Sequence, residues 1–190
     1  MKRRIAKWIQ AVLRRAYTAT HSKPPSIFMR VAYYVPRQVA LITTRHEEAD
    51  NVWPMDWHFP LSEEPRLYGL AVTSTSYGAE LIRGSGVFVV NFVPHTWEDI
   101  ILHCGHVSGQ TEDKFAATGL VKEQAASVDA PRLRGALGVL ECRVEQTHSV
   151  GDHTLFVGRV THASGQSEAQ RLHHLDRELA PQAQHFEAHR

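Results

Sequence analysis

The sequence has few cysteines, no long apolar run and no acidic residue near its start. Cys104 and Cys142 lie far apart without a C-x-x-C pair, which argues against a disulfide framework and against a zinc knuckle. No stretch approaches the roughly 18 apolar residues that a membrane-spanning helix requires. These absences favour a globular protein of a reducing compartment, and we expect it to be cytoplasmic.

Familiar nucleotide-binding and catalytic motifs are also missing. Gly84 and Gly86 form a G-x-G, but they follow an expected helix, whereas a dinucleotide fingerprint must follow a strand. The chain has no G-x-x-x-x-G-K-[ST] and no G-x-S-x-G. His103, Cys104 and His106 match no familiar metal-site spacing, and we expect Cys104 to be a small buried residue in a tight turn.

Positive charge is concentrated in residues 1–25, which hold seven Lys and Arg residues and no acid. The net charge of the whole chain is +1, so the remainder stands at −6. Such an acidic body argues against nucleic acid as a partner. Apolar residues of this arm recur every three to four positions, as in an amphipathic helix. It could pack on the body or a partner subunit, lie on a membrane surface or be disordered, and we favour the first.

The length of 190 residues suits one globular domain, since 43% of the residues are hydrophobic and 22% are charged. We divide the chain into a basic helix and linker at 1–25, a domain at 26–165, and a polar, His-rich C-terminal helix or tail at 166–190. The tail has Leu172, Leu175 and Leu179 at helical spacing.

Short β-type runs dominate the middle of the chain. We expect strands at 39–44, 68–72 and 87–91, and a hairpin of 136–147 with 154–163 that has one wet face. Helices are expected at 77–83, 96–103 and 113–118. Pro54 and Pro60 make 51–62 an irregular edge or loop. The pattern predicts a mainly β fold, a barrel or sandwich, with peripheral helices.

A hydroxyl-rich turn lies between the strand at 68–72 and the helix at 77–83. Its four residues are Thr73, Ser74, Thr75 and Ser76. Helix N-termini carry unpaired N–H groups and a partial positive charge, so this turn could seat a phosphate. The same residues could simply cap the helix.

A binding site for a flat ring could be built from aromatic and polar side chains. Trp53, Met55, Trp57 and Tyr77 could wall the ring, Asn51, Asp56, Ser62 and Asn91 could meet its polar edge, and Lys114 could add charge for a phosphate. FMN is the smallest cofactor that suits this combination. The alternative is that the tryptophans are plain core.

Five segments together resemble the flavin reductase-like family, whose members fold as an FMN-binding split β-barrel. They are PRQVALITT at 36–44, residues 51–62, ELIRGSGVFVVN at 80–91, CGHVSG at 104–109 with DKF at 113–115 and GL at 119–120, and LECRV at 140–144 with GDHTLFVG at 151–158. They occur in the order of the family and span about residues 31–163.

The resemblance implies a homodimer that binds FMN near the subunit interface, with the ring along 51–62 and the phosphate at the turn before the helix. NAD(P)H would reduce the flavin, which then diffuses away or carries electrons to an acceptor protein, so no catalytic side chain is needed. The alternatives are a non-enzymatic flavin-binding module and an interaction protein on a degenerate barrel. The expected cofactor-binding residues are Asn51, Trp53, Met55, Asp56, Trp57, Thr73, Ser74, Thr75, Ser76, Tyr77, Gly78, Asn91, Ser108, Gly109 and Lys114.

The chain departs from the family pattern at four positions of this expected site. Pro54 and Asp56 stand where the family usually has Thr and Ser, and Asp56 would place a negative charge near the reduced flavin. Ser76 and Gly78 stand where the family typically has a cation and a Thr. We therefore expect weakened FMN binding, and restoration by Ser76→Arg with Gly78→Thr.

Overall fold

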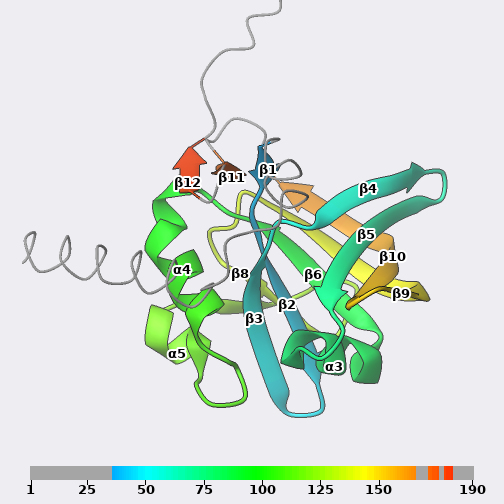
Figure 1. The fold of residues 1–190 in the computed structure, drawn as a ribbon, viewed down its shortest axis with the longest axis horizontal. Coiled ribbons are helices and arrows are strands. Elements are labelled where there is room, and N and C mark those ends of the chain that lie inside the picture. The colour runs from blue at the N-terminus through cyan, green and yellow to red at the C-terminus, as the bar shows by residue number, and fades with distance from the viewer. Residues whose placement is uncertain (1–35, 166–170, 176–177, 182–190) are drawn as a thin grey trace, which may run out of the picture.

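A seven-stranded antiparallel sheet forms the centre of the protein (Figure 1). The structure is a computed structural model that describes residues 36–165, 171–175 and 178–181. Along the sheet the strands follow the order β3-β2-β6-β9-β10-β5-β4. They are β2 (Ala40–His46), β3 (Ala49–Met55), β4 (His58–Glu63), β5 (Arg66–Thr73), β6 (Val87–Phe92), β9 (Gly138–Val150) and β10 (His153–Gly165). The expected mainly β fold is confirmed.

The central strands β2 and β6 are covered on both faces, which explains why each begins with a continuous apolar run, at 40–42 and at 87–90. Ile42 and Phe88 lie in one buried cluster, together with Phe156 of β10. Leu41 and Val89 point the other way, into two further buried clusters that include residues of 93–139. Burial on both faces fixes the register of these strands, because a slip of one residue would exchange the two cores.

The two end strands of the sheet follow one another in the chain. β3 and β4 stand at opposite ends of the strand order, yet only Asp56 and Trp57 separate them in the chain. The carbonyl oxygen of Trp57 accepts a hydrogen bond from the amide of Ala71 at 3.0 Å. No ladder joins β3 to β4 among the described residues, so the junction rests on this two-residue corner.

Residues 51–62 confirm the expected irregular edge. Most of them belong to β3 and β4, the end strands of the sheet, and the pairing of β4 with β5 shifts register between Pro60 and Ser62. Pro54 and Pro60 fit there because an end strand has only one paired side, so that a missing N–H is tolerated.

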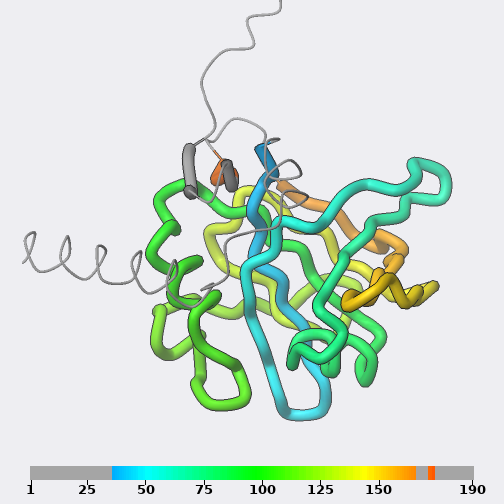
Figure 2. Tube along the Cα trace, in the orientation of Figure 1, coloured from blue at the N-terminus to red at the C-terminus, as the bar shows by residue number. Residues whose placement is uncertain are grey.

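Helices cover the flanks of β3, as Figures 1 and 2 show. The helix α3 (Tyr77–Ser85) packs on β2 and β3, while α4 (Glu98–His106), preceded by the 3-10 turn η1 (His95–Trp97), and α5 (Lys114–Thr118) pack on β3 from the other side. The three expected helices are confirmed. In the part of the chain that the structure describes, no helix has the length and apolar character needed to span a membrane.

The helix α4 is longer than the sequence predicts. It continues to His106, so the tight turn expected at Cys104 is wrong. Gly105 is tolerated in this last turn because the helix lies close to β3: a Cβ on Gly105 would be 3.2 Å from Cγ of Pro54. The small Gly105 therefore allows α4 to pack closely against β3.

The C-terminal segment pairs as strands, and the predicted helix is wrong for its described part. β11 (Leu172–Leu175) and β12 (Glu178–Pro181) form a three-stranded sheet with β1 (Arg37–Gln38). Leu172 is buried, and its carbonyl oxygen accepts from the amide of Val39 at 2.9 Å. Tertiary pairing thus overrides the helical spacing of the leucines. The basic arm at 1–25 and the tail at 182–190 lie outside the described residues.

The predicted wet face of the β9–β10 hairpin contains a buried carboxylate, which corrects another expectation. Glu141 is fully buried, and it accepts hydrogen bonds from the amides of Ala126 and Ser127 and from the Ser127 hydroxyl at 2.6–2.8 Å. Burial opposes the charge of Glu141, but these hydrogen bonds outweigh it and lower the pKa of the carboxyl group.

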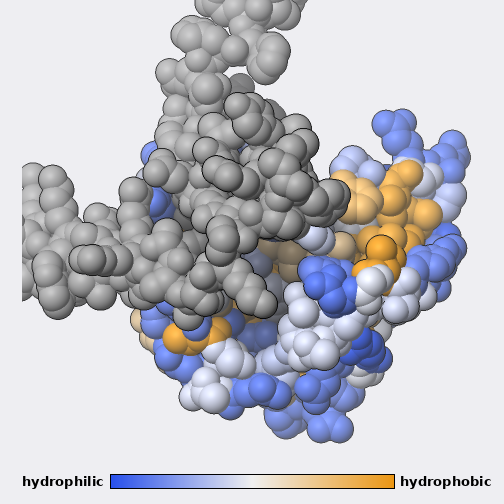
Figure 3. Space-filling view, in the orientation of Figure 1, coloured by the Kyte–Doolittle hydropathy of each residue, from blue (hydrophilic) through white to orange (hydrophobic). Residues whose placement is uncertain are grey.

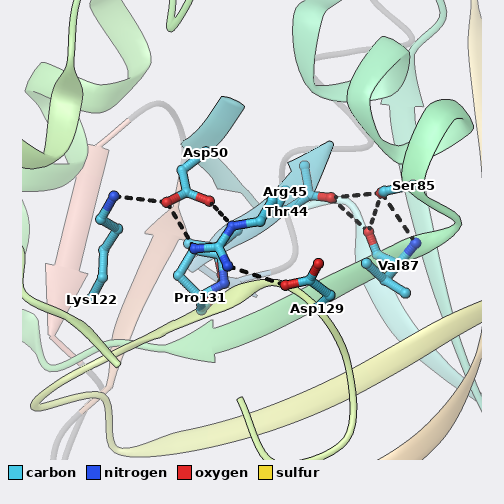
Figure 4. A network of polar contacts seen from close by, with 9 residues as sticks. Thr44, Arg45, Asp50, Ser85, Val87, Lys122, Asp129 and Pro131 are labelled. Carbon is cyan, nitrogen blue, oxygen red and sulfur yellow. Dashed lines mark hydrogen bonds and ion pairs between the residues drawn. The ribbon is translucent and has the colours of Figure 1, made fainter. Parts of the chain in front are cut away.

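A polar network anchors the end of the β2–β3 hairpin to the small sheet of β7 (Lys122–Gln124) and β8 (Pro131–Leu133) (Figure 4). Asp50 accepts hydrogen bonds from Arg45 and Lys122, both at 2.7 Å, and Arg45 also reaches Asp129 at 3.1 Å. Burial raises the pKa of Asp50, yet the two cations lower it overall. The network fixes β3, which carries the candidate site.

Candidate functional site

A cleft of about 780 Å³ opens beside β3, between the start of α3, the α4–α5 connection and the turn that begins β10. The predicted site residues that line it are Asn51, Trp53, Met55, Asp56, Trp57, Thr73, Ser76, Tyr77, Gly78, Ser108, Gly109 and Lys114. Four segments far apart in the chain are therefore brought to one hollow. The predicted residues Ser74, Thr75 and Asn91 do not line it.

Two polar atoms of β3 are buried without a hydrogen-bond partner among the described residues. They are Oδ1 of Asn51 and Nε1 of Trp53, and both residues line the cleft. Asn51 is only 3% exposed. Buried polar atoms are nearly always paired, because leaving one unpaired costs about 1–3 kcal/mol. An acceptor and a donor are therefore left for a ligand.

Two glycines let neighbouring backbone approach β3 closely. A Cβ on Gly78 would be 2.8 Å from Cζ2 of Trp53, and a Cβ on Gly109 would be 2.2 Å from Oδ1 of Asn51. Real Cβ contacts of this kind do not occur without movement of the neighbour. The Trp53 ring therefore leaves no room for a side chain at position 78, which explains why this chain has Gly there and not Thr.

The hydroxyl turn caps α3 and faces the cleft. The Ser76 hydroxyl accepts from the amide of Ala79 at 3.3 Å, so Ser76 is the N-cap. Thr73 and Ser76 line the cleft, whereas the Ser74 hydroxyl lies 2.9 Å from that of Thr154 and Thr75 is exposed outside it. The cap is thus observed, and a phosphate seat remains compatible with the same turn.

The negative charge of Asp56 is paired. Its Oδ2 accepts from Nη2 of Arg37 at 3.0 Å and from Nε at 3.2 Å. Both side chains are about one-fifth exposed, at 20% and 19%. The expectation that Asp56 presents a bare charge to the flavin overlooked Arg37, because Arg37 of β1 and Asp56 of the β3–β4 corner are 19 residues apart in the chain. The guanidinium neutralises the carboxylate beside the cleft.

Asp152 and His153 are cleft residues that the sequence analysis missed. The ring of His153 stacks on Trp57 with centroids 4.7 Å apart, and its Nδ1 lies 2.7 Å from Oδ1 of Asp152. The hydrogen bond from His153 is the main cause that lowers the pKa of Asp152. Their signal was present in the GDH of 151–153, one of the family-like phrases, but no role was assigned to it.

Lys114 brings a buried cation to the cleft wall. It is 4% exposed, and its Nζ donates to the carbonyl oxygen of Cys104 at 2.8 Å. Burial lowers the pKa of Lys114, and burial raises the pKa of the Cys104 thiol to about 11. Cys104 is therefore a protonated thiol near neutral pH.

Asn91 serves the core instead of the cleft. Its Nδ2 donates to the carbonyl oxygen of Leu41 at 3.0 Å and to the Thr43 hydroxyl at 3.0 Å, while its Oδ1 accepts from the amide of Leu133 at 2.9 Å. All of these hydrogen bonds join β6 to neighbouring strands. We leave Asn91 out of the site.

Comparison with known proteins decides the family. The model of the flavin reductase like domain matches residues 32–182. The chain belongs to the flavin reductase-like family. It is therefore a flavin-binding oxidoreductase that reduces flavin, as the sequence predicts.

Similar proteins include both uncharacterized and assigned members. An uncharacterized protein of Archaeoglobus fulgidus is 34% identical over 70% of this chain and 74% of its own. The reductase subunit HsaB of a flavin-dependent monooxygenase of Mycobacterium tuberculosis is 27% identical over 72% of this chain and 70% of its own. A crystal structure of an FMN-binding protein of Thermus thermophilus has a TM-score of 0.75 and 25% identity, covering 86% of this chain and 94% of its own.

The cleft residues fit a flavin of this family. Asn51 and Trp53 offer an unpaired acceptor and donor, and Gly78 and Gly109 keep the adjoining backbone close to them. Trp53 of β3, Trp57 of the following corner and Tyr77 of α3 line the same hollow, as a flat ring requires.

Proposed function

We propose that the cleft binds FMN and that NADH or NADPH reduces it there. The observation that carries the proposal is the pair of orphaned atoms, Oδ1 of Asn51 and Nε1 of Trp53, on a wall that continues into the hydroxyl turn of α3. A ring with a polar edge and a phosphate tail uses both features at once. The FMN-binding protein of similar fold supports this choice of flavin.

The residues of the cleft have separate tasks in this proposal. Trp53 and Trp57 give flat apolar surface, and Thr73 with the N-terminus of α3 receives the phosphate. Lys114, which lines the cleft, adds the positive charge. FMN, when bound, supplies the hydride-accepting chemistry, so the protein contributes binding and orientation.

We propose further that the reduced flavin serves a second protein. The M. tuberculosis relative is named as the reductase subunit of a flavin-dependent monooxygenase. A comparable role here would send reduced FMN to an oxygenase component, by diffusion or in a transient complex.

We also propose a homodimer that uses the projecting β4–β5 hairpin. Figure 3 shows apolar residues gathered over this end of the sheet. Phe59 and Leu61 of β4 are 42% and 41% exposed, and both lie 3.1 Å from the position of a Cβ on Gly69. Exposed apolar side chains on an end strand favour pairing with a second copy of the chain.

The test of FMN binding is a titration of the purified full chain, followed by absorbance and flavin fluorescence. We expect uptake of FMN and oxidation of NADH or NADPH that depends on flavin. Trp53→Phe keeps a ring but removes Nε1, so it should raise the Kd for FMN by about three- to tenfold. Trp97→Phe is the matched control, because Trp97 does not line the cleft. Absence of FMN uptake by the unaltered chain would refute the proposal.

A further inference from the structure

Arg83 links the end of α3 back to the turn that precedes the same helix. It stands in the last turn of α3, and its Nη2 donates to the carbonyl oxygen of Ser74 at 2.8 Å. The same nitrogen donates to Oγ1 of Thr154 at 3.0 Å. The side chain is exposed and does not line the cleft, so it has no direct access to a ligand there.

Ser74 is the shared member of this network. Its amide donates to the carbonyl oxygen of Asp152 at 2.9 Å, and its hydroxyl lies 2.9 Å from that of Thr154. The backbone and the side chain of Ser74 are therefore both tied to the first residues of β10. Arg83 completes the arrangement by occupying the carbonyl oxygen of Ser74, the polar group of this residue that points to the helix side.

The network joins two walls of the cleft. Thr73 and Ser76, which flank Ser74 in the turn, line the cleft on one side. Asp152 and His153, at the start of β10, line it on another. Holding Ser74 against β10 therefore sets where the hydroxyls of the turn and the first N–H groups of α3 lie relative to the Trp57–His153 stack.

A cation near the C-terminus of a helix also stabilises the helix through its dipole, wherever its side chain points. That general role predicts a loss of stability with no preference among ligands. The contact of Arg83 with the turn predicts a specific loss at the anion-receiving end of the cleft. The two roles are separable by comparing ligands with and without a phosphate.

We propose that Arg83 is a positioning residue, which holds the 73–76 turn in the conformation that receives the phosphate of the flavin. The inference rests on the proposed function, since it assumes that the phosphate of FMN is bound at this turn. Arg83 acts through Ser74 and Thr154 and touches neither ring nor phosphate itself. Discrimination between FMN and riboflavin, which has the same ring without the phosphate, is the property that it should control.

The experiment measures the Kd of FMN and of riboflavin for the full chain and for Arg83→Met, which keeps the aliphatic stem. We expect the Kd for FMN to rise about fivefold, because the turn loses a charge-assisted hydrogen bond, while the Kd for riboflavin changes less than twofold. Arg143→Met is the matched control: Arg143 is exposed and donates to the carbonyl oxygen of Ser127 at 2.7 Å, away from the cleft. It should alter neither Kd.

Each outcome decides the inference. If Arg83→Met raises the Kd for FMN and the Kd for riboflavin by the same factor, Arg83 has a merely structural role and the inference is overturned. The inference is also overturned if the substitution changes neither Kd. If the unaltered chain binds riboflavin as tightly as FMN, the phosphate seat itself is wrong, and the inference falls with it. If the unaltered chain prefers FMN and the variant keeps that preference, only the role of Arg83 is refuted.

A double-mutant cycle with Thr154→Val tests the route of the effect. Thr154 is hydrogen-bonded to both Arg83 and Ser74, so the effects of the two substitutions on the Kd for FMN should not add. The Kd of the double variant should be within about twofold of that of the single variant that binds FMN more weakly. Amide hydrogen exchange at Ser74 gives a readout without ligand. It should become faster in Arg83→Met, because the amide's bond to Asp152 is then less supported. Additive losses together with unchanged exchange would overturn the proposed route.

Discussion

The indole ring of Trp53 lies directly against Gly78, so that a Cβ on Gly78 would be 2.8 Å from Cζ2 of the ring. This relationship reverses an expectation from the family pattern, namely that Ser76→Arg with Gly78→Thr restores FMN affinity. A threonine at position 78 would displace the ring whose Nε1 is the candidate donor. Ser76→Arg would also remove the cap of α3.

We therefore expect Gly78→Thr to destabilise the protein by about 1–3 kcal/mol and to weaken FMN binding, because the packed ring must move. Thermal unfolding and an FMN titration would measure both effects. Adding Trp53→Leu should recover part of the stability, since the smaller side chain leaves room. Tighter FMN binding by Gly78→Thr would contradict the packing described here.

Gly109→Ala should disturb the opposite end of the cleft. Its Cβ would be 2.2 Å from Oδ1 of Asn51, so the amide must rotate away from its position on β3. We expect the Kd for FMN to increase about tenfold or more, with a smaller loss of stability. Asn51→Ala provides the comparison. If Asn51 mediates the effect, adding Gly109→Ala to Asn51→Ala should raise the Kd for FMN little further. A large further loss would exclude this explanation.

The buried carboxylate of Glu141 should make the stability of the protein depend on pH. Because its pKa is below the ordinary value of 4.5, its contribution is present above about pH 4.5 and is lost as the pH falls through the lower folded value. Glu141→Gln should therefore lower the free energy of unfolding by about 2 kcal/mol at pH 7. The difference in this free energy between the variant and the unaltered chain should narrow below pH 4.5. The exposed Glu145, on the same strand, is the control. A constant difference down to pH 3 would contradict the assignment.

Both thiols should react slowly in the folded protein. Burial raises the pKa of Cys104 to about 11 and that of Cys142 to about 12, so a thiol reagent at pH 8 meets only about one thiolate in a thousand at Cys104. We expect almost no rapid labelling under native conditions and labelling of both residues after unfolding. Fast native labelling that disappears in Cys104→Ser would show a reactive thiol in the cleft.

Substitution of the exposed apolar pair on β4 should change the oligomeric state. Phe59→Ser with Leu61→Ser removes the apolar surface over Gly69, so the proposed dimer should dissociate at concentrations where the unaltered chain is dimeric. Light scattering after size-exclusion chromatography measures this. Val121→Ser is the matched control, because Val121 is 45% exposed and lies outside the hairpin. A chain that is monomeric without any substitution would refute the dimer.

Much of the candidate site follows from local sequence. The cap at Ser76, the helix that it starts and the strand before it are encoded in neighbouring residues, and the structure confirms them. The five family-like segments, each short, identify the family because their order and spacing are shared. The residues that they contain line most of the cleft, since homologous chains fold these segments to the same place.

Tertiary structure decided what depends on residues distant in the chain. Leu172 lies in a strand instead of a helix because β1 offers it a partner, and Glu141 is buried because the amides of Ala126 and Ser127 satisfy it. Arg37 of β1 neutralises Asp56 of the β3–β4 corner, and Trp53 requires a glycine at position 78. The amino-acid sequence by itself determined the family and the secondary structure around the site, because those depend on local pattern. Only the folded chain decided which charges are paired and which atoms of Asn51 and Trp53 remain for a ligand, because contacts between distant segments set both.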